Sequence, residues 1–150
     1  MLSKRPRVLC VDDDEDSRVM LITFLKLALI EAKAVGTAAQ ALSIIQTERF
    51  DLYLLDGWLP GLDGFELCRQ MRAFDPDTPI LFFSGAAYEA DKKRGLDAGA
   101  NAYVVKPDVD GLVGSITQLV SKAESATAKI IPFRPKMSFS SPLTFEPAAA

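Results

Sequence analysis

The stretch DLYLLDGWLPGLDG, residues 51–64, is the part of the sequence from which the rest is interpreted. Its apolar run, residues 52–55, has the length of a buried strand. The run ends on Asp56, which opens into a loop that contains three glycines and a proline. Asp56 is therefore predicted at the tip of a strand. By itself, an aspartate in that position is most simply explained as a turn residue, so its function depends on the rest of the chain.

Length and composition narrow the classes of function. The chain has 150 residues, enough for one domain with a single core, and 49% hydrophobic with 25% charged residues is typical of a soluble globular protein. The formal net charge is −3 and the largest basic run is Lys92-Lys93-Arg94, so nothing indicates direct binding to nucleic acid. The chain has no histidine, which excludes a Ser-His-Asp triad, a histidine metal ligand and a phosphohistidine donor.

The cysteines and the apolar segments indicate a cellular compartment. Cys10 and Cys68 lie far apart within apolar segments, which is typical of buried, reduced thiols. The N-terminal residues lead into only four apolar positions, too few for a signal peptide, and the most apolar stretch, residues 19–30, is too short to span a membrane. We expect a cytoplasmic protein without membrane contact.

Short apolar runs alternate with segments that have helical features. The predicted strands cover residues 8–11, 32–35, 52–55, 80–83 and 102–105, and the predicted helices cover residues 14–29, 36–47, 65–74, 89–98 and 112–120. The strands are continuous apolar runs, as expected for a parallel sheet with helices on both faces. We therefore predict an α/β fold with a doubly wound, five-stranded parallel sheet.

The composition changes after Ala123. The last 27 residues contain four prolines and many serines and alanines, without any apolar period. We predict one domain over residues 1–123 and a flexible tail over residues 124–150 that is too short to be an output domain.

Polar residues follow four of the predicted strands. Parallel strands place their carboxyl ends on one edge of the sheet, so Asp12, Asp13, Asp56, Ser84 and Lys106 should converge there. Carboxylates within roughly 5 Å of each other repel by about 3 kcal/mol per pair at an effective dielectric of about 20. A cation must therefore lie among them, and Mg²⁺ suits carboxylates combined with a backbone carbonyl and a phosphate oxygen.

Such a site can bind a phosphoryl group, with the metal on one side and Ser84 and Lys106 on the other. Asp56 is the candidate nucleophile because it ends the central strand. Each residue alone has a simpler explanation, since a serine before glycine is usually a turn residue and Lys106-Pro107 is usually a solvated strand exit. Only their joint placement favours phosphoryl transfer.

Together these residues resemble the receiver domain of response regulators in two-component signalling. The resemblance covers about residues 5–123 and rests on Asp12-Asp13, Asp56-x-x-Leu59-Pro60-x-x-Asp63-Gly64, Ser84, and Gly99-Ala100-x-x-Tyr103-x-x-Lys106-Pro107. It implies a (βα)5 flavodoxin-like fold in a stand-alone receiver, a regulatory protein rather than an enzyme. A sensor histidine kinase or a histidine phosphotransfer protein would phosphorylate Asp56, and phosphorylation would change binding to an unknown downstream protein or to a second copy of the chain.

The resemblance also implies roles for the individual residues. Asp12, Asp13 and Asp56 would hold Mg²⁺ together with the backbone carbonyl of Trp58, and Asp13 would be a direct ligand. Ser84 and Lys106 would bind the phosphoryl oxygens, and the Lys106-Pro107 peptide would be cis. Tyr103 would be the switch aromatic, which rotates inward when the phosphoryl group attracts the Ser84 hydroxyl.

Two features depart from a generic pattern. Trp58 and Ala86 flank the path of an attacking water and offer it no polar side-chain partner, so we predict slow self-dephosphorylation. The predicted helix over residues 14–29 is apolar around most of its circumference, which makes its exposed side a candidate partner site. The resemblance implies that this side is the kinase-docking face.

Two alternatives stay open at this point. A haloacid-dehalogenase-type phosphatase would use Asp12-x-Asp14 with Ser84 and Lys106, but it has no use for Asp56, and Asp16 stands where that family has Thr or Val. A receiver fold could also serve as a constitutive interaction module, although the presence of the complete site residues argues against it.

Overall fold

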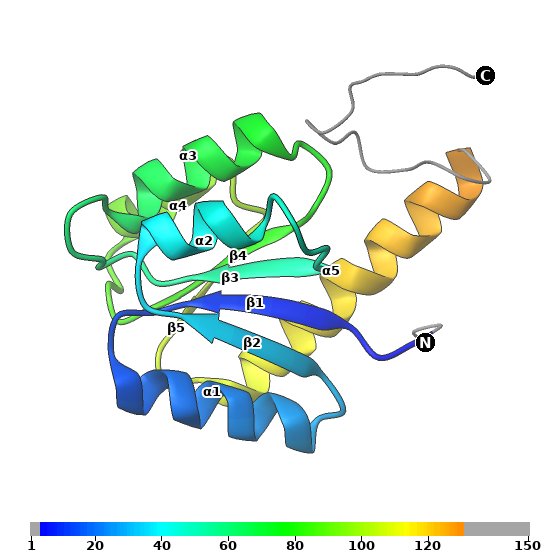
Figure 1. Ribbon diagram of the computed structural model, residues 1–150, viewed down its shortest axis with the longest axis horizontal. Coiled ribbons are helices and arrows are strands. Elements are labelled where there is room, and N and C mark those ends of the chain that lie inside the picture. The colour runs from blue at the N-terminus through cyan, green and yellow to red at the C-terminus, as the bar shows by residue number, and fades with distance from the viewer. Residues whose placement is uncertain (1–3, 131–150) are drawn as a thin grey trace.

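Five strands of the chain form one parallel sheet, which confirms the predicted α/β architecture (Figure 1). The computed structural model describes residues 4–130. The strands are β1 (Arg7–Val11), β2 (Glu31–Val35), β3 (Leu52–Leu55), β4 (Ile80–Ser84) and β5 (Ala102–Val105), in the spatial order β2-β1-β3-β4-β5. The apolar run of β3 is central and wholly buried, so the strand that precedes Asp56 is enclosed by protein.

Five helices cover the two faces of this sheet. They are α1 (Glu15–Leu27), α2 (Ala38–Ile44), α3 (Gly64–Phe74), α4 (Glu89–Asp97) and α5 (Val109–Ile130). Figure 1 shows α2, α3 and α4 on one face and α1 and α5 on the other. Between residues 4 and 130, the structure has no helix with the length and apolar content needed to cross a membrane.

The alternation of side chains along each strand divides the core into two layers. Tyr53 and Leu55 of β3 pack with α2 and α3, whereas Leu52 and Leu54 pack with α1 and α5. A strand that is buried between the two layers must therefore be apolar on both faces, which is why β1, β3 and β4 appear as unbroken apolar runs in the sequence.

Helices α1 and α2 begin later than predicted because the residues expected to start them are N-caps. The Asp14 carboxylate accepts a hydrogen bond from the Ser17 N–H, and the Thr37 hydroxyl accepts one from the Gln40 N–H. Each cap satisfies a backbone N–H that the helix leaves unpaired, which stabilises the first turn of the helix.

The C-terminal helix extends past the position of the predicted domain boundary, which itself stays a prediction. Helix α5 continues to Ile130, so residues 124–130 are helical and the boundary expected after Ala123 falls inside the helix. Figure 1 shows the last turns of α5 extending beyond the sheet. Residues there have no sheet to cover and need no apolar period, so the sequence pattern ends before the helix does. The rest of the predicted tail, residues 131–150, lies outside the described residues.

Both cysteines are free and buried, as predicted. Burial, together with the charge of Asp12, raises the pKa of the Cys10 thiol to about 12. Burial raises the pKa of the Cys68 thiol to about 11. Since the thiolate is the reactive form, these residues act as small apolar groups in the core.

A buried polar network joins the sheet to the α3–β4 loop at the edge opposite the candidate site. The Tyr53 hydroxyl and the Thr78 hydroxyl each donate a hydrogen bond of 2.7 Å to Oδ2 of Asp75. The backbone N–H groups of Asp77 and Thr78 donate to Oδ1 at 3.2 Å. The buried carboxylate thus has several donors, which offset the cost of removing it from water.

The Tyr53 hydroxyl should contribute measurably to stability. We expect Tyr53→Phe to lower the free energy of unfolding by about 1–3 kcal/mol, because a buried carboxylate loses one donor and gains no replacement. Urea unfolding followed by circular dichroism measures the change. Tyr88→Phe is the matched control, since Tyr88 is 80% exposed, and we expect it to change stability by less than about 0.5 kcal/mol. Equal effects in the two variants would contradict a stabilising role for the network.

Candidate functional site

The register of the sheet brings two aspartates side by side. Strands β1 and β3 are neighbours, and Val11 of β1 pairs with Leu55 of β3. The next residues are Asp12 and Asp56, whose backbone N–H groups continue the ladder by donating to Val35 and Val11, respectively. The main chain therefore holds both aspartates at the carboxyl edge of the sheet, as the topology predicted.

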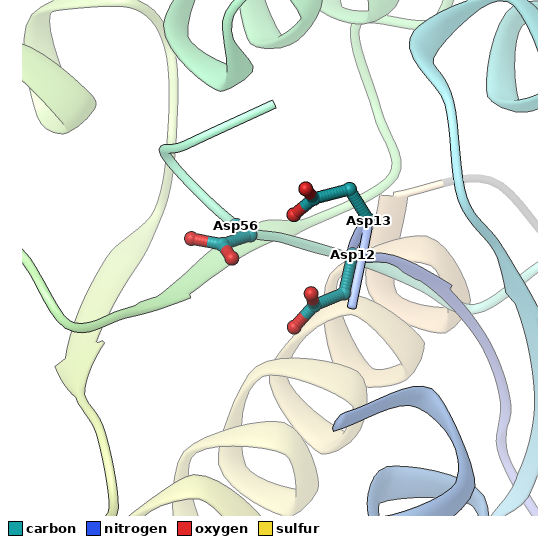
Figure 2. Close-up of side chains that lie close together, drawn as sticks. All are labelled: Asp12, Asp13 and Asp56. Carbon is teal, nitrogen blue, oxygen red and sulfur yellow. The ribbon is translucent and has the colours of Figure 1, made fainter. Parts of the chain in front are cut away.

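Three carboxylates gather at this edge. Oxygens of Asp12, Asp13 and Asp56 lie within 4.8 Å of one another, and Figure 2 shows the three side chains together where β1 and β3 end. Asp12 and Asp56 are only 2% and 7% exposed, whereas Asp13 is exposed to solvent. The cluster therefore has two enclosed carboxylates and one that faces outward.

Lys106 lies between the two buried carboxylates. Its Nζ donates hydrogen bonds to Oδ2 of Asp12 at 2.9 Å and to Oδ2 of Asp56 at 3.3 Å. Backbone N–H groups bind the other oxygens, from Asp14 to Asp12 at 3.0 Å and from Trp58 to Asp56 at 3.2 Å. Each buried carboxylate oxygen thus has a donor, and the Lys106–Pro107 peptide that follows is cis.

The environment shifts the acidity of both partners. Burial raises the pKa of the Asp56 carboxyl group, while the Trp58 N–H and the Lys106 ammonium oppose the rise. Burial lowers the pKa of Lys106, but the carboxylates of Asp12 and Asp56 outweigh that effect and leave the pKa above its usual value. Lys106 is therefore a permanent cation in this site.

The carboxylate cluster fits a hard divalent cation. One ammonium group compensates only one of the three carboxylates, and the donors are all oxygens, which Mg²⁺ prefers. The exposed carboxylate of Asp13 leaves one side of the cluster open to solvent, so that water molecules could complete the coordination.

Ser84 closes the other side of the site. It ends β4, is fully buried, and its Oγ accepts a hydrogen bond of 3.2 Å from the Ala86 N–H. The loop after Asp56 passes close to it, since a Cβ at Gly57 would lie 3.3 Å from Ser84 Oγ. The hydroxyl therefore lies beside the loop that carries the candidate nucleophile.

Tyr103 is half-buried and turned toward the loop after Ser84. Its ring stacks on Phe82 with 5.6 Å between ring centroids, and its hydroxyl donates a hydrogen bond of 2.7 Å to the Ala86 carbonyl. A movement of Ser84 would reach this ring through Ala86, only two residues away. Tyr103 thus contacts the loop that follows Ser84.

The Asp63-Gly64 pair shapes the loop that follows Asp56. Asp63 caps α3 through the Glu66 N–H and also binds Arg94 of α4 at 3.1 Å. A Cβ at Gly64 would overlap the backbone carbonyl of Asp56. Glycine is needed here because the loop folds back on its own start, and the close approach holds the Asp56 backbone in place.

The geometry disfavours the phosphatase alternative. Its second catalytic aspartate would be Asp14, but the Asp14 carboxylate caps α1 by accepting from the Ser17 N–H at 2.8 Å. That bond lowers the pKa of Asp14. Asp14 is also absent from the group of three carboxylates found in the described part of the chain.

One residue near the site was not predicted. Arg18 of α1 donates a hydrogen bond of 2.8 Å from Nη1 to the backbone carbonyl of Asp12. No sequence signal marks such a contact, because its acceptor is a backbone atom that every residue possesses.

Comparison with known proteins agrees with this geometry. A family model described as response regulator receiver domain matches residues 8–117. The DNA-binding response regulator MtrA of Mycolicibacterium smegmatis is 38% identical over 107 residues, which cover 71% of this chain and 46% of MtrA. The chain thus spans about half the length of this curated relative.

Two solved structures are similar to most of the chain. A CheY-like response regulator receiver domain protein from Methanospirillum hungatei is 29% identical with a TM-score of 0.76, over 82% of this chain and 99% of that one. The receiver domain of a sensor histidine kinase from Pseudomonas aeruginosa is 26% identical with a TM-score of 0.72, over 78% of this chain and 98% of that one. The latter has a magnesium ion coordinated in its active site cleft.

The raised pKa of Asp56 predicts a pH-dependent gain in stability for Asp56→Asn. Folding raises the pKa of the Asp56 carboxyl group above its value in the unfolded chain, which is about 3.9. The free energy of unfolding of the wild type therefore falls as the pH rises from the unfolded-state pKa through the folded-state pKa. In metal-free buffer, the variant should therefore be more stable than the wild type at pH 7, and the gain should shrink toward pH 4.

Urea unfolding at both pH values measures this difference. Asp77→Asn is the control, because Asp77 is exposed and precedes β4 at the opposite edge of the sheet. A gain for Asp56→Asn that is the same at pH 7 and pH 4 would show that burial of the charge is not its cause.

Proposed function

The chain belongs to the response regulator receiver domain family, which acts in two-component signalling, and we propose that it is a switch that accepts a phosphoryl group on Asp56. The main observation in support is that Asp56 ends the central strand within 4.8 Å of two further carboxylates while it binds Lys106. That combination of a nucleophile, an anionic metal site and a fixed ammonium group suits phosphoryl transfer.

In the proposed reaction, a carboxylate oxygen of Asp56 attacks phosphorus and the bond from phosphorus to the donor nitrogen breaks. The electron pair leaves with the imidazole of the donor. The donor is a phosphohistidine of a sensor histidine kinase or a phosphotransfer protein, since this chain has no histidine of its own. Burial makes Asp56 more basic than an exposed aspartate, which favours nucleophilic attack.

The proposed metal ligands are Asp12, Asp13, Asp56 and the backbone carbonyl of Trp58. When bound there, Mg²⁺ would neutralise charge on the carboxylates and on the phosphoryl oxygens. Support comes from the oxygen donor set of the cluster and from the magnesium ion in the related Pseudomonas aeruginosa receiver domain.

Lys106 and Ser84 are the proposed ligands of the phosphoryl oxygens. Lys106 Nζ already lies at the nucleophile and is free to exchange a carboxylate oxygen for a phosphoryl oxygen. The Ser84 hydroxyl would donate to a second oxygen. Because Ser84 and Tyr103 both bind Ala86, a shift of Ser84 would alter how the Tyr103 ring packs against Phe82 and thereby the nearby surface of α4.

The exposed side of α1 is the proposed kinase-docking face. It carries apolar side chains that the core does not use, including Val19 and Ile22, and Leu27 is 77% exposed. Such a surface is costly to leave in water and is typical of a protein contact. The downstream partner is proposed to be a protein or a second copy of the chain; DNA binding is a property of MtrA by its description.

Intact mass spectrometry after incubation with Mg²⁺ and acetyl phosphate tests the proposed function. We expect the wild type to gain one phosphoryl group that is stable in acid and labile in base, and Asp56→Asn to gain none. An adduct on Asp56→Asn would identify another nucleophile. The absence of an adduct on folded wild type that binds Mg²⁺ would instead favour a constitutive interaction module.

The lifetime of the phosphoryl group is a separate prediction. Trp58 is 65% exposed and Ala86 is buried, and neither side chain can orient a water for attack on phosphorus. We expect the phosphoryl group on Asp56 to be hydrolysed severalfold faster in Trp58→Asn than in the wild type, because the asparagine amide can hold a water by hydrogen bonds. Decay of the adduct after removal of acetyl phosphate measures both rates. Equal rates in the two proteins, or a wild-type half-life of seconds, would refute slow self-dephosphorylation.

A further inference from the structure

Arg18 connects the start of α1 to the backbone of the acidic loop. Its side chain is half-buried, and Nη1 donates a hydrogen bond of 2.8 Å to the carbonyl oxygen of Asp12. A hydrogen bond from a charged donor is among the stronger ones in proteins. The acceptor belongs to the peptide unit between Asp12 and Asp13, so the contact acts on the orientation of both residues.

The loop after β2 contains a glycine, Gly36, beside the guanidinium group of Arg18. A Cβ at Gly36 would lie 2.9 Å from Nη1 and 3.4 Å from Cζ of Arg18. A Cβ at this position would be too close to Nη1, the atom that donates to the Asp12 carbonyl, so the guanidinium would have to shift. The absence of a side chain at Gly36, in the loop after β2, therefore leaves room for the hydrogen bond between Arg18 and the Asp12 carbonyl in the loop after β1.

The other polar atoms of Asp12, its N–H and both carboxylate oxygens, also make hydrogen bonds. Its N–H donates to the Val35 carbonyl at 3.1 Å, and its carboxylate binds the Asp14 N–H and Lys106. The Asp13 carboxylate, by contrast, is exposed and makes no hydrogen bond within residues 4–130. Within the described residues the backbone is therefore what restrains Asp13, and Arg18 holds the peptide unit that precedes it.

We propose that Arg18 is a positioning residue that orients Asp13 for binding a divalent cation, by holding the Asp12 carbonyl. The inference rests on the proposed function for its biological purpose, but the binding of Mg²⁺ to the cluster can be measured without any phosphoryl transfer. Residues that act on metal ligands from outside the coordination shell commonly change metal affinity by about tenfold or more.

The positive charge of Arg18 and its hydrogen bond would have opposite effects on the affinity of the cluster for Mg²⁺. A positive charge near a carboxylate cluster weakens cation binding, so removing the charge alone should tighten it. Loss of the hydrogen bond should weaken it, because Asp13 would no longer be held in place. The sign of the change therefore distinguishes the two effects.

The experiment titrates Mg²⁺ against the fluorescence of Trp58, the only tryptophan of the chain, whose N–H binds Asp56. Arg18→Met removes the donor and the charge, while Gly36→Ala displaces the guanidinium and keeps the charge. We expect the Mg²⁺ dissociation constant to rise about tenfold in Gly36→Ala. It should rise less in Arg18→Met, because loss of the positive charge partly offsets loss of the hydrogen bond. The control is Arg69→Met, an equal change of charge on the exposed surface of α3, which should leave the constant unchanged.

A second readout separates positioning from loss of structure. With acetyl phosphate as donor, the Mg²⁺ concentration for half-maximal phosphorylation of Arg18→Met should rise by the same factor as its dissociation constant, with a much smaller change in the rate at saturating Mg²⁺. Urea unfolding in metal-free buffer checks that each variant is folded.

Tighter Mg²⁺ binding in Arg18→Met, or unchanged binding in folded Gly36→Ala, would overturn the proposal. If the wild type binds Mg²⁺ but acquires no phosphoryl group, the proposed function fails while the fluorescence titration still decides the role of Arg18.

Discussion

The site depends on the repulsion between two buried carboxylates and on the lysine that compensates it. Asp12 and Asp56 are buried at adjacent strand ends, where two carboxylates would repel by about 3 kcal/mol at an effective dielectric of about 20. Lys106, from the end of a third strand, donates to both. The ion pairs are acceptable in a buried place because backbone N–H groups satisfy the remaining oxygens. The three strand ends are thereby held together in a state that is ready to receive another cation.

Buried carboxylates at the two edges of the sheet are compensated in different ways. At one edge, the Asp75 carboxylate accepts hydrogen bonds from Tyr53, Thr78 and backbone N–H groups, and it ties a loop to the sheet. At the other edge, three carboxylates face a single ammonium, and burial raises the pKa of Asp56. The first arrangement favours a rigid fold. The second keeps an excess of negative charge that a metal ion can relieve, which is the property a reactive site needs.

Much of this structure could be predicted, and the failures have physical reasons. Buried parallel strands must be apolar on both faces, so β1, β3 and β4 were recognisable as unbroken runs. The convergence of Asp12, Asp56 and Lys106 followed from the rule that parallel strands end on one edge. The length of α5 did not follow, because its last turns extend past the sheet and have no apolar period. Arg18 could not be found, since it binds a backbone carbonyl.

The sequence by itself determined the order of strands and helices, the loops that carry the polar residues and the type of chemistry that those residues support. These features are encoded locally, in apolar runs, in cap residues such as Asp14 and Asp63, and in glycines such as Gly64. Only the tertiary structure decided which acids are buried and that Lys106 lies between two of them. Those outcomes depend on distances between residues up to 94 positions apart, which no local pattern of apolar and polar residues contains.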